Sequence, residues 1–222
     1  MTAIKIIQPA GIGDIIYCQK IAHSLCLHYG AVYWPLAPQL FYVPDYLNRA
    51  NNLIYDDTGD KDCEILDLQS AHHHHVSGGI MEAKYAMAGI DGGNWQDYVR
   101  LQRNTRAELA IKTRSNPPQN YALACFNYAT PPETFRATFT PQTKLPVFEI
   151  TVLGGFTPFD WCQMIEGARE LHFVDTVFTY LAEVLDTSGC EGNMYLYPRD
   201  RHVNKIVTKE VWKKPWKYSI SL

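Results

Sequence analysis

The sequence predicts an α/β protein built from two Rossmann-like halves, each with a parallel sheet, that face each other across a cleft. Two observations support this prediction. Short apolar runs alternate with helical patterns along the chain, which is typical of strand–helix–strand units in parallel sheets. The alternation stops at a polar, proline-containing connector, residues 115–120, and then starts again. We therefore expect one half at residues 1–114 and the other at residues 115–222.

In the first half, strands are expected at short apolar runs and helices where apolar residues recur every three or four positions. The first strand leads through a glycine turn into a helical segment that closes at Gly30. The last helical region carries charge on one side and is interrupted by glycines. The predicted strands are 3–8, 31–34, 53–55 and 63–68, and the predicted helices are 14–29, 44–49 and 80–112.

In the second half, the same alternation predicts four strands and two helices. A basic tail, residues 198–222, follows them. We expect the tail to cross back to the first half and to bury its tryptophans, Trp212 and Trp216. The predicted strands are 121–126, 146–152, 171–174 and 193–197, and the predicted helices are 159–169 and 176–185.

The composition suits cores of this size and argues against several classes of protein. Of the 222 residues, 46% are apolar, and the formal net charge of −3 gives no general attraction to nucleic acids or membranes. The six cysteines lack the spacing of a zinc site or a disulfide framework, so we expect reduced, mostly buried thiols in a cytoplasmic protein. No apolar stretch is long enough to span a membrane, and no signal peptide is apparent.

The most informative segment is the turn that follows the first strand, Gly11-Ile-Gly13-Asp14. A strand, a glycine turn and a helix N-terminus form an arrangement in which backbone N–H groups receive an anion. The turn lacks the third glycine and the downstream acid of a dinucleotide fingerprint. Asp14 in this place is a candidate base facing the cleft, and the alternative is a plain helix cap.

A second strand-to-helix turn is predicted at residues 171–178, with Asp175 and Thr176 as the turn and the first helical residues. The N–H groups after Val174 would bind the phosphates of a ligand. The loop after strand 121–126 should open at the same edge. Its candidates are Asn127 and Arg136, an arginine that either pairs with a diphosphate or is solvated.

Residues 160–183 carry a pattern that resembles a known protein family. It is Asp160-x2-Gln-x-Ile-x2-Ala-x2-Leu-His172-x-Val-Asp175-Thr-x-Phe-x-Tyr-Leu-x-Glu183, and it is similar to the C-terminal signature of GT-B-fold glycosyltransferases of the heptosyltransferase-like group. The turn at residues 11–16 is similar to the G-x-G-D turn of the same group. Residues 84–98 resemble a segment of its small bacterial and viral relatives.

The resemblance implies a compact GT-B-like enzyme that transfers a sugar from a nucleotide-diphosphate donor to an acceptor hydroxyl. It implies Asp14 as the base, with the first half on the acceptor side and the second half binding the donor. His172 and Glu183 would then lie near the donor; the alternatives are a packed strand histidine and an exposed helix acid. Such enzymes usually need no metal, because helix N-termini and cationic side chains carry the charge of the leaving group. We expect no cofactor.

Two further features leave alternatives open. His72 and His74 belong to a run of four histidines after strand 63–68, and they are candidates for touching the acceptor rather than for holding a metal. The tail lysines with Trp212 and Trp216 would suit a phage-type enzyme that glycosylates modified DNA bases. A third possibility is a nucleotide-binding protein that has lost catalysis.

Overall fold

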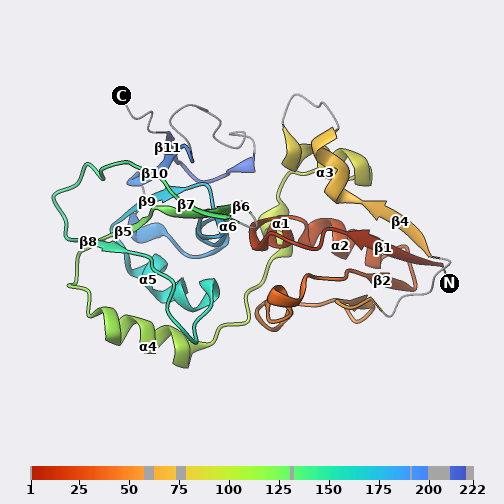
Figure 1. Cartoon of the computed structure of the whole chain (residues 1–222), viewed down its shortest axis with the longest axis horizontal. Helices are drawn as coiled ribbons and strands as arrows, with labels where there is room; N and C mark the ends of the chain where they lie inside the picture. Colours follow the sequence, from red (N-terminus) through yellow and green to blue (C-terminus); the bar gives the residue numbers. More distant parts are fainter. Residues whose placement is uncertain are drawn as a thin grey trace. The chain divides into compact units, whose positions relative to one another are not determined.

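The computed structural model describes residues 2–57, 63–73, 79–130, 133–190, 192–199 and 211–218, without the side chains of His72 and Thr130. The chain divides into two compact units, Met1–Gln102 and Arg103–Leu222. Each unit is built around a parallel sheet flanked by helices (Figure 1), so the predicted α/β class with two Rossmann-like sheets is confirmed.

The division of the chain lies before helix α4 (Thr105–Ser115), whereas the sequence suggested a boundary after residue 114. Helix α4 packs on α5 (Cys162–Gly167) of the second unit. An ion-pair network fixes this contact, because the guanidinium of Arg103 binds both Glu108 of α4 and Glu166 of α5. Glu108 has no exposed side-chain surface, so its charge depends on Arg103.

The first unit contains four parallel strands in the order β3–β2–β1–β4. Strand β1 (Ala3–Ile7) has β2 on one side and β4 on the other, so the strand order reverses between β1 and β4. Ligands of open α/β sheets bind at the carboxyl ends of the strands at such a point. The other elements are β2 (Ala31–Tyr33), β3 (Leu53–Ile54), β4 (Glu64–Asp67), α1 (Ile12–Tyr17), α2 (Gln19–Cys26), α3 (Ile80–Ala88) and the 3-10 turns η1 (Pro38–Leu40), η2 (Val43–Tyr46), η3 (Leu68–His73) and η4 (Trp95–Tyr98).

A cluster of rings holds α1, α3 and η4 together beside this sheet. The ring of Tyr17 lies 4.9 Å from that of Tyr85 and 5.2 Å from that of Trp95, centre to centre, both edge to face. The hydroxyl of Tyr85 donates to the carbonyl of Tyr17 at 2.6 Å. All three rings are buried. Helix α3 is thereby fixed against the turn that follows β1.

The second unit contains five parallel strands in the order β11–β10–β9–β5–β8. Its first strand in the chain, β5 (Ala122–Cys125), lies between β8 and β9, so the strand order reverses between β5 and β9. The other elements are the hairpin β6 (Asn127–Thr130) and β7 (Glu133–Arg136), β8 (Val147–Glu149), β9 (Glu170–Val174), β10 (Met194–Tyr197), β11 (Lys217–Tyr218), α6 (Val177–Val184) and the 3-10 turns η5 (Pro158–Trp161) and η6 (Ser188–Cys190).

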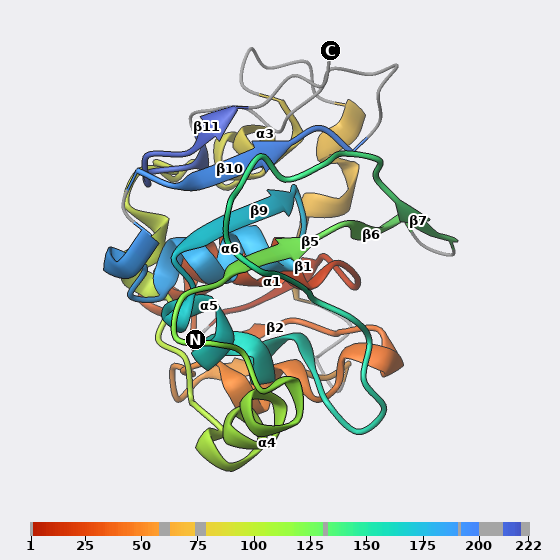
Figure 2. The same ribbon diagram turned by 90° about the vertical axis from the view of Figure 1, so that its left-hand side faces the viewer.

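The connection from β5 to β8 differs from a standard crossover. It runs in the opposite direction to the connections from β8 to β9 and from β9 to β10, so right-handed crossovers place it on the other face of the sheet. Its described part contains the β6–β7 hairpin and no helix. Figure 2 shows the hairpin projecting beyond the end of β5. The sequence analysis did not predict this hairpin.

The two faces of the second sheet are therefore covered differently. On one face, Phe173 of β9 lies 6.4 Å from the ring of Phe178 in α6. On the other face, Phe139, which follows the hairpin, stacks on Tyr197 of β10 with ring centres 3.8 Å apart. His172 stacks on Tyr195 of the same strand at 4.7 Å. Flat ring contacts thus supply the packing that a helix would give elsewhere.

The described part of the tail, residues 211–218, lies on the second unit. We expected the tail to cross back to the first half; instead, β11 pairs with β10 and extends the second sheet. The predicted burial of the tryptophans is confirmed, since 5% of Trp212 and 6% of Trp216 are exposed. Trp212 packs edge to face on Tyr180 of α6 at 4.8 Å. Lys205 and Lys209 lie outside the described residues.

Candidate functional site

In the first unit, the turn after β1 brings the carboxylate of Asp14 to the point where the strand order reverses. Gly11 adopts a positive φ of 89°. This conformation favours glycine, and a Cβ at Gly11 would also push the carboxylate of Asp14 out of its place. Gly13 lies in the first turn of α1. The side chain of Asp14 therefore occupies the place where the turn was expected to receive an anion.

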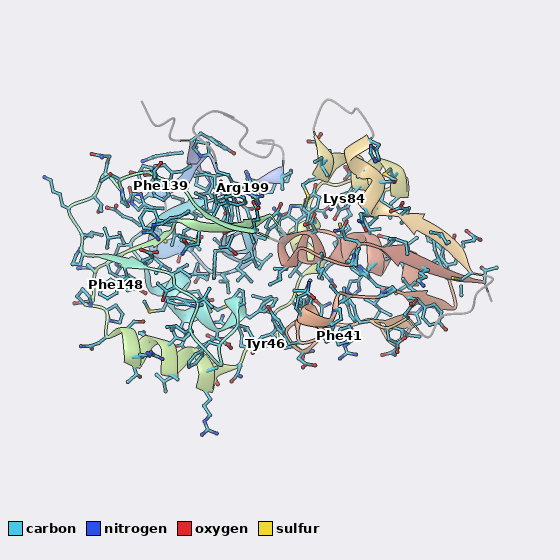
Figure 3. All side chains as sticks on the ribbon, viewed as in Figure 1. Phe41, Tyr46, Lys84, Phe139, Phe148 and Arg199 are labelled. Carbon is cyan, nitrogen blue, oxygen red and sulfur yellow. The ribbon has the colours of Figure 1, made fainter. Side chains whose placement is uncertain are left out.

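Asp14 forms an ion pair with Lys84 of α3, which Figure 3 labels. The Lys84 side chain is 4% exposed, whereas that of Asp14 is 31% exposed. Asp14 thus presents a carboxylate to solvent on one side and is paired with a buried ammonium group on the other. Such a group can accept a proton from a bound hydroxyl. The sequence analysis placed Lys84 in a family-like segment but did not predict this pairing.

Neighbouring groups in the first unit are engaged within the fold. Burial raises the pKa of the Cys18 thiol to about 12, which rules it out as a thiolate nucleophile near neutral pH. The ammonium of Lys20 donates to the carbonyl of Gly93 at 2.6 Å and to Asn94 at 2.9 Å. His72 lies in η3 directly after β4, but its side chain is not described, and His74 lies outside the described residues.

In the second unit, the turn after β9 lies where the strand order reverses. Thr176 has a φ of −146° and is the residue that caps α6, so the helix begins one residue later than predicted. Its hydroxyl accepts from the N–H of Phe178 at 3.3 Å and lies 3.8 Å from Sγ of Cys125 at the end of β5. The carboxyl ends of β5 and β9 and the N-terminus of α6 therefore meet at Thr176.

Arg199 joins this edge from the end of β10 (Figure 3). Its Nε donates to the carbonyl of Asp175 at 2.6 Å, and its Nη2 lies 3.8 Å from Oδ2 of the same residue. Its guanidinium carbon lies 5.7 Å from the ring centre of Tyr128. With 38% of its side chain exposed, Arg199 offers further N–H donors to a ligand. Arg199 was not singled out from the sequence, where it falls within the basic tail, residues 198–222.

Asn127 and Arg136 come together at the base of the β6–β7 hairpin. Arg136 binds Glu149 of β8 through both terminal nitrogens, with Nη2 donating to Oε2 at 2.8 Å. Asn127 lies within 3.5 Å of both partners. Arg136 holds the pKa of the Glu149 carboxyl below its usual range, so this partner stays ionised. Glu149 was not predicted, because nothing in its local sequence shows that β8 ends beside β5.

His172 and Glu183 are engaged inside the second unit. His172 is fully buried; its Nδ1 lies 2.9 Å from the hydroxyl of Tyr197 and its Nε2 lies 3.1 Å from Oε2 of Glu170. Burial lowers its pKa. Glu183 accepts from the indole of Trp216 and from the backbone of the tail. In the structure, His172 thus takes the alternative role that the sequence left open, a packed strand histidine. The alternative given for Glu183, an exposed helix acid, is wrong, because this residue is only 4% exposed and its carboxylate is bound inside the unit.

Within the part of the chain that the structure describes, no three His, Cys, Asp or Glu side chains gather in a way that would hold a metal ion. Among the same residues, no helix has the length and apolar character needed to cross a membrane. All six cysteines are free thiols.

Comparison with protein-family models finds no match, and no curated protein matches the chain. Solved structures do resemble it, among them three glycosyltransferases. A family 9 glycosyltransferase from Veillonella parvula aligns with a TM-score of 0.51 and 9% identity over 89% of this chain and 80% of its own. The iron-containing dodecameric glycosyltransferase TibC from enterotoxigenic Escherichia coli gives 0.52 and 10% over 88% of this chain and 57% of its own. The E. coli heptosyltransferase WaaC with ADP aligns with a TM-score of 0.47 and 10% identity, over 88% of this chain and 87% of its own.

At these identities the first two likenesses show the fold. The chain has the fold of glycosyltransferases of this kind, and it spans little more than half the length of TibC. The resemblance that the motifs indicated is therefore confirmed at the level of the fold.

Proposed function

We propose that this chain, which has the fold of these glycosyltransferases, transfers a sugar from a nucleoside-diphosphate donor to an acceptor hydroxyl. One observation carries the proposal: each sheet has polar groups suited to half of this reaction at the point where its strand order reverses. The first sheet presents the carboxylate of Asp14. The second presents Arg199 and the N-terminus of α6 there, and Arg136 beside the end of β5.

In this reaction the first unit binds the acceptor and the second unit binds the donor. Asp14 takes the proton of the acceptor hydroxyl as the oxygen attacks the anomeric carbon of the sugar. The bond from that carbon to the diphosphate breaks, and the nucleoside diphosphate leaves with the electron pair. Arg199 and Arg136 stabilise the charge that develops on the leaving group. We propose that this stabilisation needs no metal.

A donor screen tests the proposal. The purified chain is incubated with a panel of nucleotide sugars in the presence of EDTA, and release of nucleoside diphosphate is measured. Hydrolysis or transfer with one donor, insensitive to EDTA, is the expected result. Binding of nucleoside diphosphates without turnover of any donor would favour the non-catalytic alternative. Loss of turnover in EDTA would reject metal independence.

Two classes of acceptor are considered, saccharides and modified DNA. We propose a saccharide or other small hydroxyl compound, because the tryptophans that would stack on DNA bases are occupied in the fold. Trp216 is bonded to Glu183, and Trp212 packs on Tyr180. The ammonium of Lys214 also points inward and donates to Thr187 at 2.8 Å. Transfer to DNA that weakens steeply with salt would support the phage-type alternative instead.

A further inference from the structure

The side chains of Arg136 and Glu149 form a contact that resembles the recognition of a phosphate group. The carboxylate approaches the end of the guanidinium, with one oxygen at each terminal nitrogen. A diphosphate presents its oxygens to an arginine in the same forked geometry. The ring of Phe126 lies 4.7 Å from the guanidinium carbon and supports its flat face.

This ion pair is open to solvent. The Arg136 side chain is 54% exposed and that of Glu149 is 30% exposed. Ion pairs of such exposure contribute little to folding stability, so a ligand is able to separate the two groups without unfolding the unit. The aromatic pair on the hairpin, Tyr128 with Phe135 at 5.4 Å, belongs to the neighbouring cross-strand pair and faces the other way.

We propose that Glu149 is an internal competitor for the phosphate site, which holds Arg136 until the donor's diphosphate displaces it. This inference rests on the proposed function, since it assumes that Arg136 binds the donor. Glu149 lowers the apparent affinity by the fraction of molecules in which it occupies Arg136. Ligands that lack phosphate do not use Arg136 and escape this effect. Glu149 thus sets how tightly an anion must bind Arg136 in order to displace the carboxylate.

Neutralising Glu149 tests the inference. The dissociation constant of inorganic pyrophosphate is measured by calorimetry for the wild type, for Glu149→Gln and for the matched control Glu133→Gln. The control removes an exposed charge from the hairpin strand that carries Arg136. We expect Glu149→Gln to bind pyrophosphate about tenfold more tightly, as for a competitor that holds Arg136 about nine-tenths of the time. Glu133→Gln should bind like the wild type.

An Arg136→Met background supplies the second arm of the test. There, Glu149→Gln should leave the affinity unchanged, because the group for which Glu149 competes is absent. Unchanged or weaker binding in the single variant would overturn the inference and make Glu149 a residue that positions Arg136. If no form of the protein binds pyrophosphate or any nucleoside diphosphate, the proposed function fails as well. If Arg136→Met binds as tightly as the wild type, only the inference about Glu149 fails.

Discussion

The indole N–H of Trp216 donates to Oε1 of Glu183 at 2.7 Å, and this bond ties the tail to helix α6. The same carboxylate accepts from the backbone N–H of Lys213 at 3.0 Å. A buried acid is tolerated in a core when several donors surround it. Glu183 therefore holds the last strand of the second sheet in place.

Replacement of Trp216 by alanine should unfold the second unit more readily. The ring is buried and touches Phe173, so its removal should lower the free energy of unfolding by about 3–5 kcal/mol. Urea denaturation measures the change, with Lys112→Ala on the exposed surface of α4 as the control. A stability equal to that of the control would mean that the tail is not part of the folded core.

Replacement of Asp14 by asparagine should abolish transfer while nucleoside-diphosphate binding persists. The amide keeps the size of the side chain but accepts no proton, so turnover should fall by about 10²–10⁴-fold. Because the buried Lys84 loses its anionic partner, the melting temperature should also fall. The double variant Asp14→Asn, Lys84→Met should recover stability but not turnover. Near-normal turnover in either variant would reduce Asp14 to a structural residue.

Replacement of Arg199 by methionine should weaken binding of nucleoside diphosphates. A hydrogen bond to a charged group contributes about 1.5–3 kcal/mol, which corresponds to a rise of about 10- to 150-fold in Kd. Arg114→Met, on the exposed end of α4, removes the same charge from the same unit and should change little. Equal effects of the two substitutions would point to net charge rather than to a contact with the ligand.

His172 should make the protein less stable in mild acid. Burial lowers its pKa below the ordinary value of 6.5, an effect that the nearby Glu170 opposes. Below pH 6.5 the imidazole is protonated in the unfolded chain but stays neutral in the folded chain. The free energy of unfolding therefore decreases as the pH is lowered, by at most about 1.4 kcal/mol per pH unit. Thermal unfolding at pH 8 and pH 6 should differ less in His172→Gln than in the wild type.

His23 provides the control for that measurement, since burial lowers its pKa as well. The variant His23→Gln should remove only its own share of the pH dependence. An unchanged difference between pH 8 and pH 6 in His172→Gln would show that His172 takes up a proton equally readily in the folded protein and in the unfolded chain.

Local patterns were sufficient to predict most of the strands and the two turns that matter most. The apolar run before Gly11 and the run before Asp175 each end at a point where the strand order reverses. The partners of these turns come from distant segments, as Lys84 does for Asp14 and Arg199 does for Asp175. No periodicity within the sequence contains that information, because sheet order and helix packing decide which side chains meet.

The β6–β7 hairpin was missed for a different reason. Its strands are short, and helical or loop character is expected where an α/β protein crosses between parallel strands. The antiparallel pairing, which runs from Asn127 with Arg136 to Thr130 with Glu133, shows that the chain doubles back here. The split of the predicted helix 14–29 at Cys18 likewise carries no signal such as glycine or proline.

The crossover from β5 to β8, whose described part holds no helix, also indicates where this protein tolerates added chain. Handedness assigns the segment between Arg136 and Pro146 to the face that carries His172, whatever its length. An insertion there would lengthen the cover of that face and leave the carboxyl ends of β5 and β9 unchanged. A helix or a reporter grafted onto the second unit would therefore be placed after Phe139, because the handedness of the crossover already fixes the face of the sheet on which it would lie.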